Sequence, residues 1–279
     1  MATPSNAGRA QKARPVSHRS RLRVVWENFK SIVGALAIFL VLRAFIIEAY
    51  RIPSGSMIPT LLVGDWLFVN KAIYGAHVPF SRASLPAYRE PKRGDVVVFV
   101  SPYQADEAQY GRDPTPTLVK RLVGTPGDTL YMRNGVLYLN GIAQRQGFGV
   151  GQPDAAIGNS VDPLFDWQKK AGLKSSRFGA APAQPTHDDW GPLVVPTKKL
   201  FMMGDSRYNS KDSRYWGFVP RENVRGKPLF VYYSYNADDS DRPLPMLTDI
   251  RWSRIGHGIK ELRTPGCRRR IGERSVFSL

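Results

Sequence analysis

The chain has 279 residues, enough for one large or two small domains with appended segments. Its net charge is +17, but the basic residues are concentrated at the two ends, which suits membrane topology or anionic lipid and gives nucleic acid little support as a partner. Because Cys267 is the single cysteine, a disulfide within the chain and a cysteine-based zinc site are both excluded.

The first strong pattern is a basic stretch followed by an apolar run. Residues 1–30 are rich in Arg and Lys, and residues 31–47 are apolar except for Arg43. This length is at the lower end of what spans a bilayer as a helix. We therefore predict a basic cytoplasmic leader over residues 1–30 and a single transmembrane anchor over residues 31–50. The positive-inside rule places the N-terminus in the cytoplasm and the rest of the chain outside.

Two other interpretations of the apolar run remain open. A cleavable signal peptide also joins a basic region to a short apolar one, although Arg43 and Glu48 lie where its small-residue cleavage site belongs. A buried core helix is the other interpretation, but the run is apolar all round and not on one stripe. We favour an uncleaved anchor over both.

Directly after the anchor comes RIPSGSMIPTL, residues 51–61, with two serines around a glycine. The prolines on either side fix φ and lack an N–H donor, and Gly55 permits a turn that most residues disfavour. The pattern predicts a stiff, extended loop that presents Ser54 and Ser56. Taken alone, it is equally compatible with a polar linker that ends a helix.

The body of the chain alternates, or runs apolar, at strand length between turn signals. The predicted strand segments are 65–75, 94–102, 117–128, 129–141, 200–205 and 227–236, and the fourth reads as a hairpin through Asn134 and Gly135. Strands do not alternate with helices, which disfavours a parallel α/β sheet, so we predict a mostly β body. Residues 145–190, rich in Gly, Ala and Pro, predict a flexible, variable insertion, and residues 263–279 predict a mobile basic tail.

A catalytic serine needs a base, and no histidine stands in a recognisable triad motif. His77 stays a conceivable base, and no HExxH pattern indicates a metal site. The other candidate is Lys120, in the apolar segment TLVKRLVG, because burial would lower its pKa toward neutrality. On a strand, Lys120 shares a face with Leu118, while Arg121 points to the opposite face. An edge strand with both cations exposed is the alternative.

A third element is MMGDSRYNSKDSRYWG, residues 202–217, in which charged and hydroxyl side chains are closely spaced. Its two acids and two arginines can pair into a network that fixes a loop, and Ser210 or Ser213 could orient a neutral lysine. By itself the segment is better explained as a salt-bridged turn than as a catalytic element. The members of the predicted charge network are Asp205, Arg207, Asp212 and Arg214.

Together, these segments resemble the successive conserved boxes of bacterial type I signal peptidase (leader peptidase). The boxes are PSGSMIPTL, GDVVVF, VKRLVGTPGD and GDSRYNSKDSRYWGFVP, and IRWSRIG resembles the closing strand of the family. The resemblance covers roughly residues 29–145 and 196–260 and leaves 146–195 unmatched. It implies a transmembrane helix followed by an antiparallel β catalytic domain, residues 51–262, with a smaller inserted domain at 145–190.

The resemblance also implies an activity and a site. The expected activity is that of a serine endopeptidase, without a cofactor, at the cytoplasmic (inner) membrane. Its partners would be the lipid bilayer and exported preproteins, whose signal peptides end in small residues at the cleavage site. The implied roles are nucleophile for Ser56, general base for Lys120, oxyanion hole for Ser54 with the Ser56 N–H, base orientation for Ser210, bracing for Asp205, Arg207, Asp212 and Arg214, and substrate pocket for Ile52, Met57, Leu118 and Val119.

Two residues depart from the usual wording of the family. Ser206 stands where asparagine is common, and Tyr208 stands where aspartate is frequent, so the detailed bracing of this loop is not implied by the resemblance. Two rivals also remain. A self-cleaving repressor with a Ser/Lys dyad would need a DNA-binding domain where the anchor stands, and a membrane-tethered β domain could bind a partner or anionic lipid without catalysis.

Overall fold

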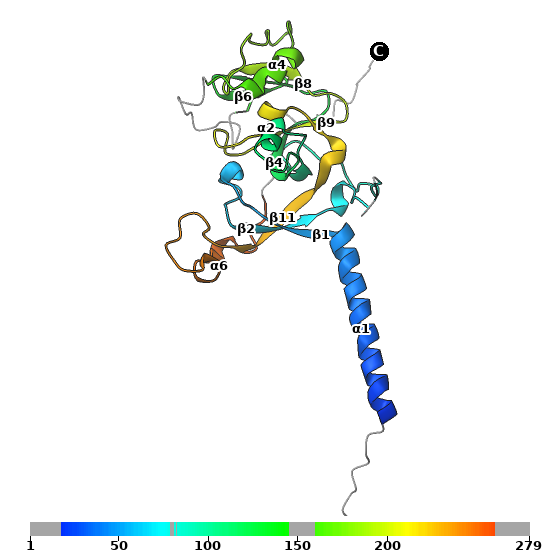
Figure 1. Ribbon diagram of the computed structural model, residues 1–279. Helices are drawn as coiled ribbons and strands as arrows, with labels where there is room; N and C mark the ends of the chain where they lie inside the picture. Colours follow the sequence, from blue (N-terminus) through cyan, green and yellow to red (C-terminus); the bar gives the residue numbers. More distant parts are fainter. Residues whose placement is uncertain (1–17, 79–80, 82, 145–159, 260–279) are drawn as a thin grey trace, which may run out of the picture. The chain divides into compact units, whose positions relative to one another are not determined.

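The structure is a computed structural model that describes residues 18–78, 81, 83–144 and 160–259 (Figure 1). The chain divides into two units, Met1–Arg43 and Ala44–Leu279. The predicted basic tail with Cys267, the first part of the leader and residues 145–159 of the predicted insertion lie outside the described residues.

The N-terminal unit is dominated by one long helix, α1 (His18–Phe45). Within its portion Arg23–Phe45, an 18-residue window has a mean hydropathy of 1.6, and none of that window is buried in protein. These 23 residues extend about 34 Å at about 1.5 Å per residue, which is enough to cross a hydrocarbon core of about 30 Å. The helix starts and ends earlier than the predicted anchor, and residues 47–50, which we expected in the anchor, lie in a strand.

The body consists of two antiparallel sheets (Figure 1). The larger sheet has the order β1-β2-β11-β3-β4-β9-β10, and the smaller has the order β7-β6-β5-β8. The strands of the larger sheet are β1 (Ile47–Arg51), β2 (Asp65–Asn70), β3 (Val96–Val100), β4 (Thr117–Gly124), β9 (Lys199–Met203), β10 (Val219–Pro220) and β11 (Val224–Ser234). Those of the smaller sheet are β5 (Thr129–Arg133), β6 (Val136–Leu139), β7 (Ile142–Ala143) and β8 (Trp190–Val194).

The predicted mostly β, antiparallel fold is confirmed, and each predicted strand segment contains a strand. The predicted hairpin joins β5 to β6, and both turn residues, Asn134 and Gly135, have positive φ, at 49° and 72°. Positive φ at both central positions is what a two-residue hairpin turn of the favoured twist requires. The structure also contains short helices: η1 (Gly55–Met57), η2 (Ala72–Tyr74), α2 (Ala105–Gln109), η4 (Pro163–Phe165), α4 (Asp166–Ala171), α5 (Ser213–Trp216), η5 (Arg221–Asn223), α6 (Pro245–Thr248) and η6 (Trp252–Arg254).

The larger sheet is buried on both faces at β3, in its interior. Val96 and Val98 of β3 belong to one hydrophobic cluster, and Val97 and Phe99 belong to another, as the alternation of side chains along a strand requires. Strand β4 lies between β3 and β9, in the interior of this sheet. The interpretation of β4 as an exposed edge strand is therefore wrong.

The smaller sheet is not confined to the predicted insertion. Strands β5, β6 and β7 precede residue 145, and β8 closes the sheet from the far side of the insertion. Its core packs against Phe201 and Met203 of β9, which joins it to the larger sheet. Strand β8 escaped sequence analysis because Gly191 and Pro192 interrupt its apolar pattern, and its position at the sheet edge is where proline is tolerated.

Candidate active site

The two serines of residues 51–61 lie in a loop that the backbone holds firmly. Ser56 is in η1, and Ser54 occupies the position before it with extended backbone. Ile52 N donates to Asp65 O at 2.8 Å, which fastens the loop to the start of β2. Ser206 N donates to Ser56 O at 3.1 Å, so the serine loop is also joined to the loop that follows β9.

Lys120 of β4 faces the serine. Its Nζ lies 2.6 Å from Ser56 Oγ, and the residue is only 4% exposed. Burial lowers the pKa of Lys120 to about 8, although the charge of Asp212 acts in the opposite direction. His77, the alternative base, makes its ring contact elsewhere, from Nε2 to Val224 O at 3.2 Å.

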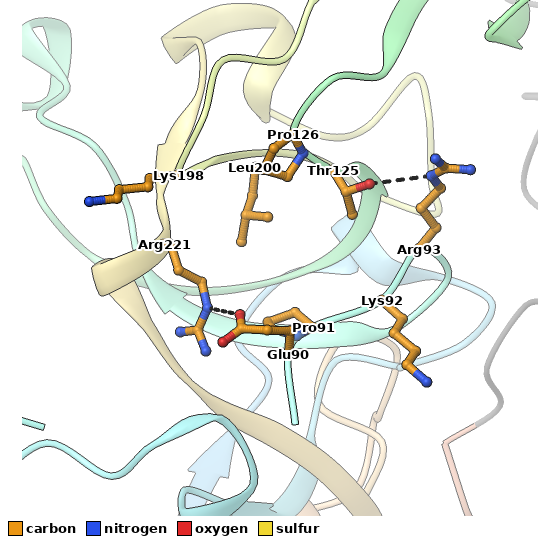
Figure 2. Close-up of a pocket in the computed structure, with 9 residues that line it drawn as sticks. All are labelled: Glu90, Pro91, Lys92, Arg93, Thr125, Pro126, Lys198, Leu200 and Arg221. Atoms are coloured by element: carbon orange, nitrogen blue, oxygen red, sulfur yellow. Dashed lines mark hydrogen bonds and ion pairs between the residues drawn. The ribbon is translucent and has the colours of Figure 1, made fainter. Parts of the chain in front are cut away.

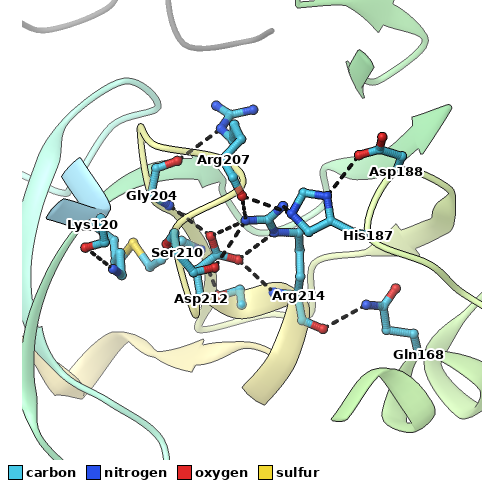
Figure 3. A network of polar contacts seen from close by, with 12 residues as sticks. Lys120, Gln168, His187, Asp188, Gly204, Arg207, Ser210, Asp212 and Arg214 are labelled. Carbon is cyan, nitrogen blue, oxygen red and sulfur yellow. Dashed lines mark hydrogen bonds and ion pairs between the residues drawn. The ribbon is translucent and has the colours of Figure 1, made fainter. Parts of the chain in front are cut away.

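Behind Lys120 lies a fully buried ion pair (Figure 3). Arg214 donates from Nε to Asp212 Oδ1 at 2.9 Å and from Nη2 to Asp212 Oδ2 at 2.8 Å, and both residues are 0% exposed. Burial alone would raise the pKa of Asp212, but Arg214 and the Gly204 N–H hold it below its ordinary value. The carboxylate therefore stays ionised, and its charge acts on Lys120.

The other two predicted network residues do not pair with each other. Asp205 forms a two-bond ion pair with Arg121 of β4, with both N–O distances at 2.7 Å, and it also accepts from Thr60 Oγ1 at 2.6 Å. Arg207 instead donates from Nε to Gly204 O at 3.1 Å. Sequence analysis missed Arg121 as the partner, although a cation buried next to Lys120 requires a counter-charge.

Ser210 is buried near this network, but its Oγ has no hydrogen-bond partner among the described residues. Its predicted role in orienting Lys120 is therefore not accompanied by a direct hydrogen bond. Ser213, the alternative, accepts from Met202 N at 2.9 Å and is engaged with β9. Gly204 makes this crowded arrangement possible, since a Cβ there would lie 2.2 Å from Ser210 Oγ and 2.5 Å from Ser56 O.

A further layer comes from the segment predicted to be a variable insertion. His187 Nε2 lies 2.5 Å from Arg214 Nη1, and Gln168 Nε2 donates to Arg214 O at 2.8 Å (Figure 3). Tyr208 stacks on the His187 ring at 4.5 Å and donates from its hydroxyl to Asp188 at 2.9 Å. Tyr208 belongs to the charged segment 202–217, but no motif in the sequence indicated Gln168, His187 or Asp188.

A cleft of about 750 Å³ opens over the serine and the lysine. Ser54, Ser56, Lys120 and Leu118 are among the residues that line it. The other predicted pocket residues are placed differently, since Ile52 and Met57 are buried at 4% and 1% exposure in the core cluster against which Val119 packs. Ile52, Met57 and Val119 therefore do not line the cleft, whereas Leu118 does.

A second cavity, of about 770 Å³, has a different character (Figure 2). Lys92, Arg93, Lys198 and Arg221 line it together with apolar surface such as Leu200, and Arg221 is paired with Glu90. Its lining contains no pair of a nucleophile and a base, so it is not the catalytic cleft. Within the described part of the chain, no group of three or more His, Cys, Asp or Glu side chains is arranged to hold a metal ion.

The chain is similar to known proteins over most of its length. The family model described as "Signal peptidase, peptidase S26" matches residues 25–233. Signal peptidase I of Pseudomonas fluorescens and of Pseudomonas aeruginosa are each 36% identical to the chain, and each alignment covers 82% of this chain and 78% of the relative. Signal peptidase I of Buchnera aphidicola subsp. Acyrthosiphon pisum is 30% identical, with 81% of each chain covered.

Proposed function

Because this chain belongs to the signal peptidase family, peptidase S26, and is therefore a serine protease, we propose that Ser56 is its nucleophile and Lys120 its general base. The family supports the removal of signal peptides as the reaction, and the apolar helix α1 fits a membrane anchor. The contact between Lys120 Nζ and Ser56 Oγ at 2.6 Å, inside a buried site, is the observation that carries the proposal.

The chemistry follows from a lysine that can lose its proton. The neutral amine of Lys120 accepts the hydroxyl proton of Ser56 as Oγ attacks the carbonyl carbon of the scissile bond. The tetrahedral intermediate then expels the new amino terminus, which takes the proton back from Lys120, and an acyl-enzyme remains. Water, activated by the same amine, hydrolyses the ester and regenerates both side chains.

The oxyanion that develops during attack needs donors in place. The backbone N–H of Ser56 and the hydroxyl of Ser54 are the proposed donors, and both residues line the cleft. One donor of this kind contributes on the order of 3 kcal/mol of transition-state stabilisation. The short η1 turn supports this role because it fixes both residues in a single rigid segment.

The proposed substrates are exported preproteins whose signal peptides end in small residues at the cleavage site. The basic residues before α1 favour an orientation with the N-terminal leader in the cytoplasm and the catalytic domain on the outer face of the inner membrane. We assign residues 1–30 to the leader, the apolar part of α1, residues 31–45, to the anchor, residues 46–262 to the catalytic domain, because β1 already pairs with β2, and residues 263–279 to the tail.

The test uses the full chain in detergent with a preprotein that bears an Ala-x-Ala junction. Wild type is compared with Ser56→Ala, Lys120→Ala and, as a matched control for the alternative base, His77→Ala. We expect wild type and His77→Ala to cleave at the junction, and the other two variants to lose activity by about 10⁴-fold. Because the base acts deprotonated, kcat/KM should rise with pH and level off above about 8, the pKa of Lys120.

Each failure identifies a different error. Cleavage by Lys120→Ala together with loss of activity in His77→Ala would contradict the proposed base while leaving the nucleophile in place. A folded wild-type protein that neither cleaves the preprotein nor reacts at Ser56 with a serine-directed acylating probe would contradict the proposed function itself.

A further inference from the structure

One buried histidine lies behind the proposed catalytic lysine and comes from the segment that the resemblance leaves unmatched. His187 is 1% exposed, and both its ring nitrogens make short contacts. Nδ1 lies 2.9 Å from Asp188 Oδ1, and Nε2 lies 2.5 Å from Arg214 Nη1 (Figure 3). These contacts constrain which ring nitrogen of His187 carries the proton.

The neighbours of His187 define that state. Arg214 can only donate and the Asp188 carboxylate can only accept, so we assign the proton to Nδ1 and the lone pair to Nε2; the other tautomer would donate from Nε2 to the Arg207 carbonyl. Burial and the charge of Arg214 lower the pKa of His187, which keeps the ring neutral. The backbone carbonyl of Arg207 lies 2.9 Å from Nε2. This carbonyl oxygen accepts a hydrogen bond from Arg214 Nη2 at 2.6 Å. Tyr208 stacks against the ring.

We propose that His187 is a positioning residue for the Ser/Lys reaction, acting as the neutral acceptor that locks Arg214 onto Asp212 and thereby sets the electrostatic field at Lys120. This inference rests on the proposed function of Lys120 as the base.

The hydrogen bonds of the Arg214 guanidinium explain why the loss of the His187 acceptor would disturb its pairing with Asp212. Its Nε and Nη2 groups bond Asp212, and Nη2 also bonds the Arg207 carbonyl. Nη1 has its contact with His187, so removal of that acceptor leaves a buried, charged N–H group unpaired. An arginine in that condition moves toward other acceptors or water and gives up part of its pairing with Asp212.

A change in the pairing of Arg214 with Asp212 alters the pKa of Lys120 through the charges of the two residues. Asp212 raises the pKa of Lys120 and Arg214 lowers it, and the two effects partly cancel while the pair is intact. When Arg214 withdraws, the carboxylate acts on Lys120 with less compensation, and the pKa of Lys120 rises. A larger share of the enzyme is then protonated and inactive at neutral pH.

The same segment holds the backbone of Arg214 as well as its side chain. Trp167 Nε1 and Gln168 Nε2 both donate to Arg214 O, at 3.0 and 2.8 Å. Tyr208, at a position where the family often has aspartate, donates to Asp188 and so supports the acceptor of His187 Nδ1. The region that looked variable in sequence thus encloses Arg214 on two sides.

The experiment compares His187→Gln with His187→Phe in the full chain in detergent. Glutamine restores a neutral acceptor near the position of Nε2, whereas phenylalanine keeps the ring and removes the acceptor. We expect His187→Phe to raise the pKa of Lys120 by about one unit and to lower kcat/KM at pH 7 by about tenfold. We expect His187→Gln to stay within about threefold of wild type, with the acidic limb of its pH profile unmoved. The matched controls, His77→Gln and His77→Phe, should leave that limb unchanged.

Two further measurements separate a positioning role of His187 from a merely structural one. The ¹³C shift of Lys120 Cε, titrated in a Ser56→Ala background, reports its pKa without any cleavage, so it tests the role of His187 even if the proposed function fails. Asp188→Leu removes the partner that holds the proton on Nδ1, at a less buried position, and should raise the same pKa. Equal losses in His187→Gln and His187→Phe without a change in the pKa of Lys120 would overturn the proposal, because a merely structural role predicts that result.

Discussion

Two lysines are buried in the larger sheet, and they have different partners. Lys120 of β4 is 4% exposed and contacts the hydroxyl of Ser56. Lys227 of β11 is 8% exposed and forms an ion pair with Asp95, with Nζ 2.9 Å from Oδ1. The sheet therefore buries one lysine against a neutral group and the other against a carboxylate.

The difference shows that burial alone does not create a base. Removal from water disfavours the charged form of any lysine, but a carboxylate in contact compensates for that loss. In the Lys120 region the buried carboxylates are already engaged, Asp212 by Arg214 and Asp205 by Arg121. The two arginines therefore occupy the acids that would otherwise pair with Lys120.

The strongest test of this comparison replaces each of the two lysines by methionine. We expect Lys120→Met to lower kcat/KM by about 10⁴-fold and to leave the protein folded, because it removes the proposed base while filling a similar volume. Lys227→Met should keep kcat/KM per folded molecule within about twofold of wild type. It should lower the free energy of unfolding by about 2 kcal/mol, because the buried Asp95 loses one charged hydrogen-bond partner while it keeps Arg89, whose Nη2 lies 3.3 Å from Oδ1.

Denaturant unfolding and steady-state kinetics on the same preparations measure both effects. If Lys227→Met lost activity as Lys120→Met does while retaining its stability, the division between a catalytic and a structural lysine would be wrong.

A smaller effect is expected from substitution of Gly204, which allows the serine loop and Ser210 to approach each other closely. A methyl group on Gly204 would lie 2.5 Å from Ser56 O and still closer to Ser210 Oγ, so Gly204→Ala must displace the serine loop. A displacement of about 1 Å at a reacting group costs on the order of 10²-fold in rate, and we expect that loss in kcat. Gly258→Ala is the matched control, since a Cβ there meets nothing within 4 Å. Equal kinetics for the two variants would contradict the packing described for the site.

Much of the site could be predicted because its chemistry lies in short, continuous segments. The serine loop, the apolar strand around Lys120 and the charged loop after β9 each carry a local pattern, and the resemblance assigned them roles. The six strand segments were also predictable, since alternation and turn residues are local signals.

The missing parts depend on contacts between distant segments. Arg121 and Asp205 are 84 positions apart, so nothing local in the sequence matches one to the other. His187 lies in a segment rich in Gly, Ala and Pro, and only tertiary packing brings it to Arg214. Strand β8 was missed because its proline is acceptable only at a sheet edge, and edge position is a property of the whole sheet.

The smallest expected effect concerns Ser210, the residue proposed to orient Lys120. Its buried hydroxyl has no partner among the described residues, whereas the hydroxyl of Ser213 accepts from Met202 N. Removal of an unpaired buried hydroxyl costs little, so Ser210→Ala should leave the free energy of unfolding unchanged or slightly higher and lower kcat by about fivefold. Ser213→Ala should instead lower the free energy of unfolding by about 1–2 kcal/mol, since a buried N–H loses its acceptor.

We propose that this partnerless hydroxyl, which lines the same cleft as Lys120, has a role in the reaction. The hydroxyl can bond to the Lys120 amine once that amine has accepted the Ser56 proton or turned toward substrate. If Ser210→Ala kept full kcat while Ser213→Ala behaved as expected, Ser210 would have no orienting role. The environment of Lys120 would then consist of Ser56 and the two ion pairs alone.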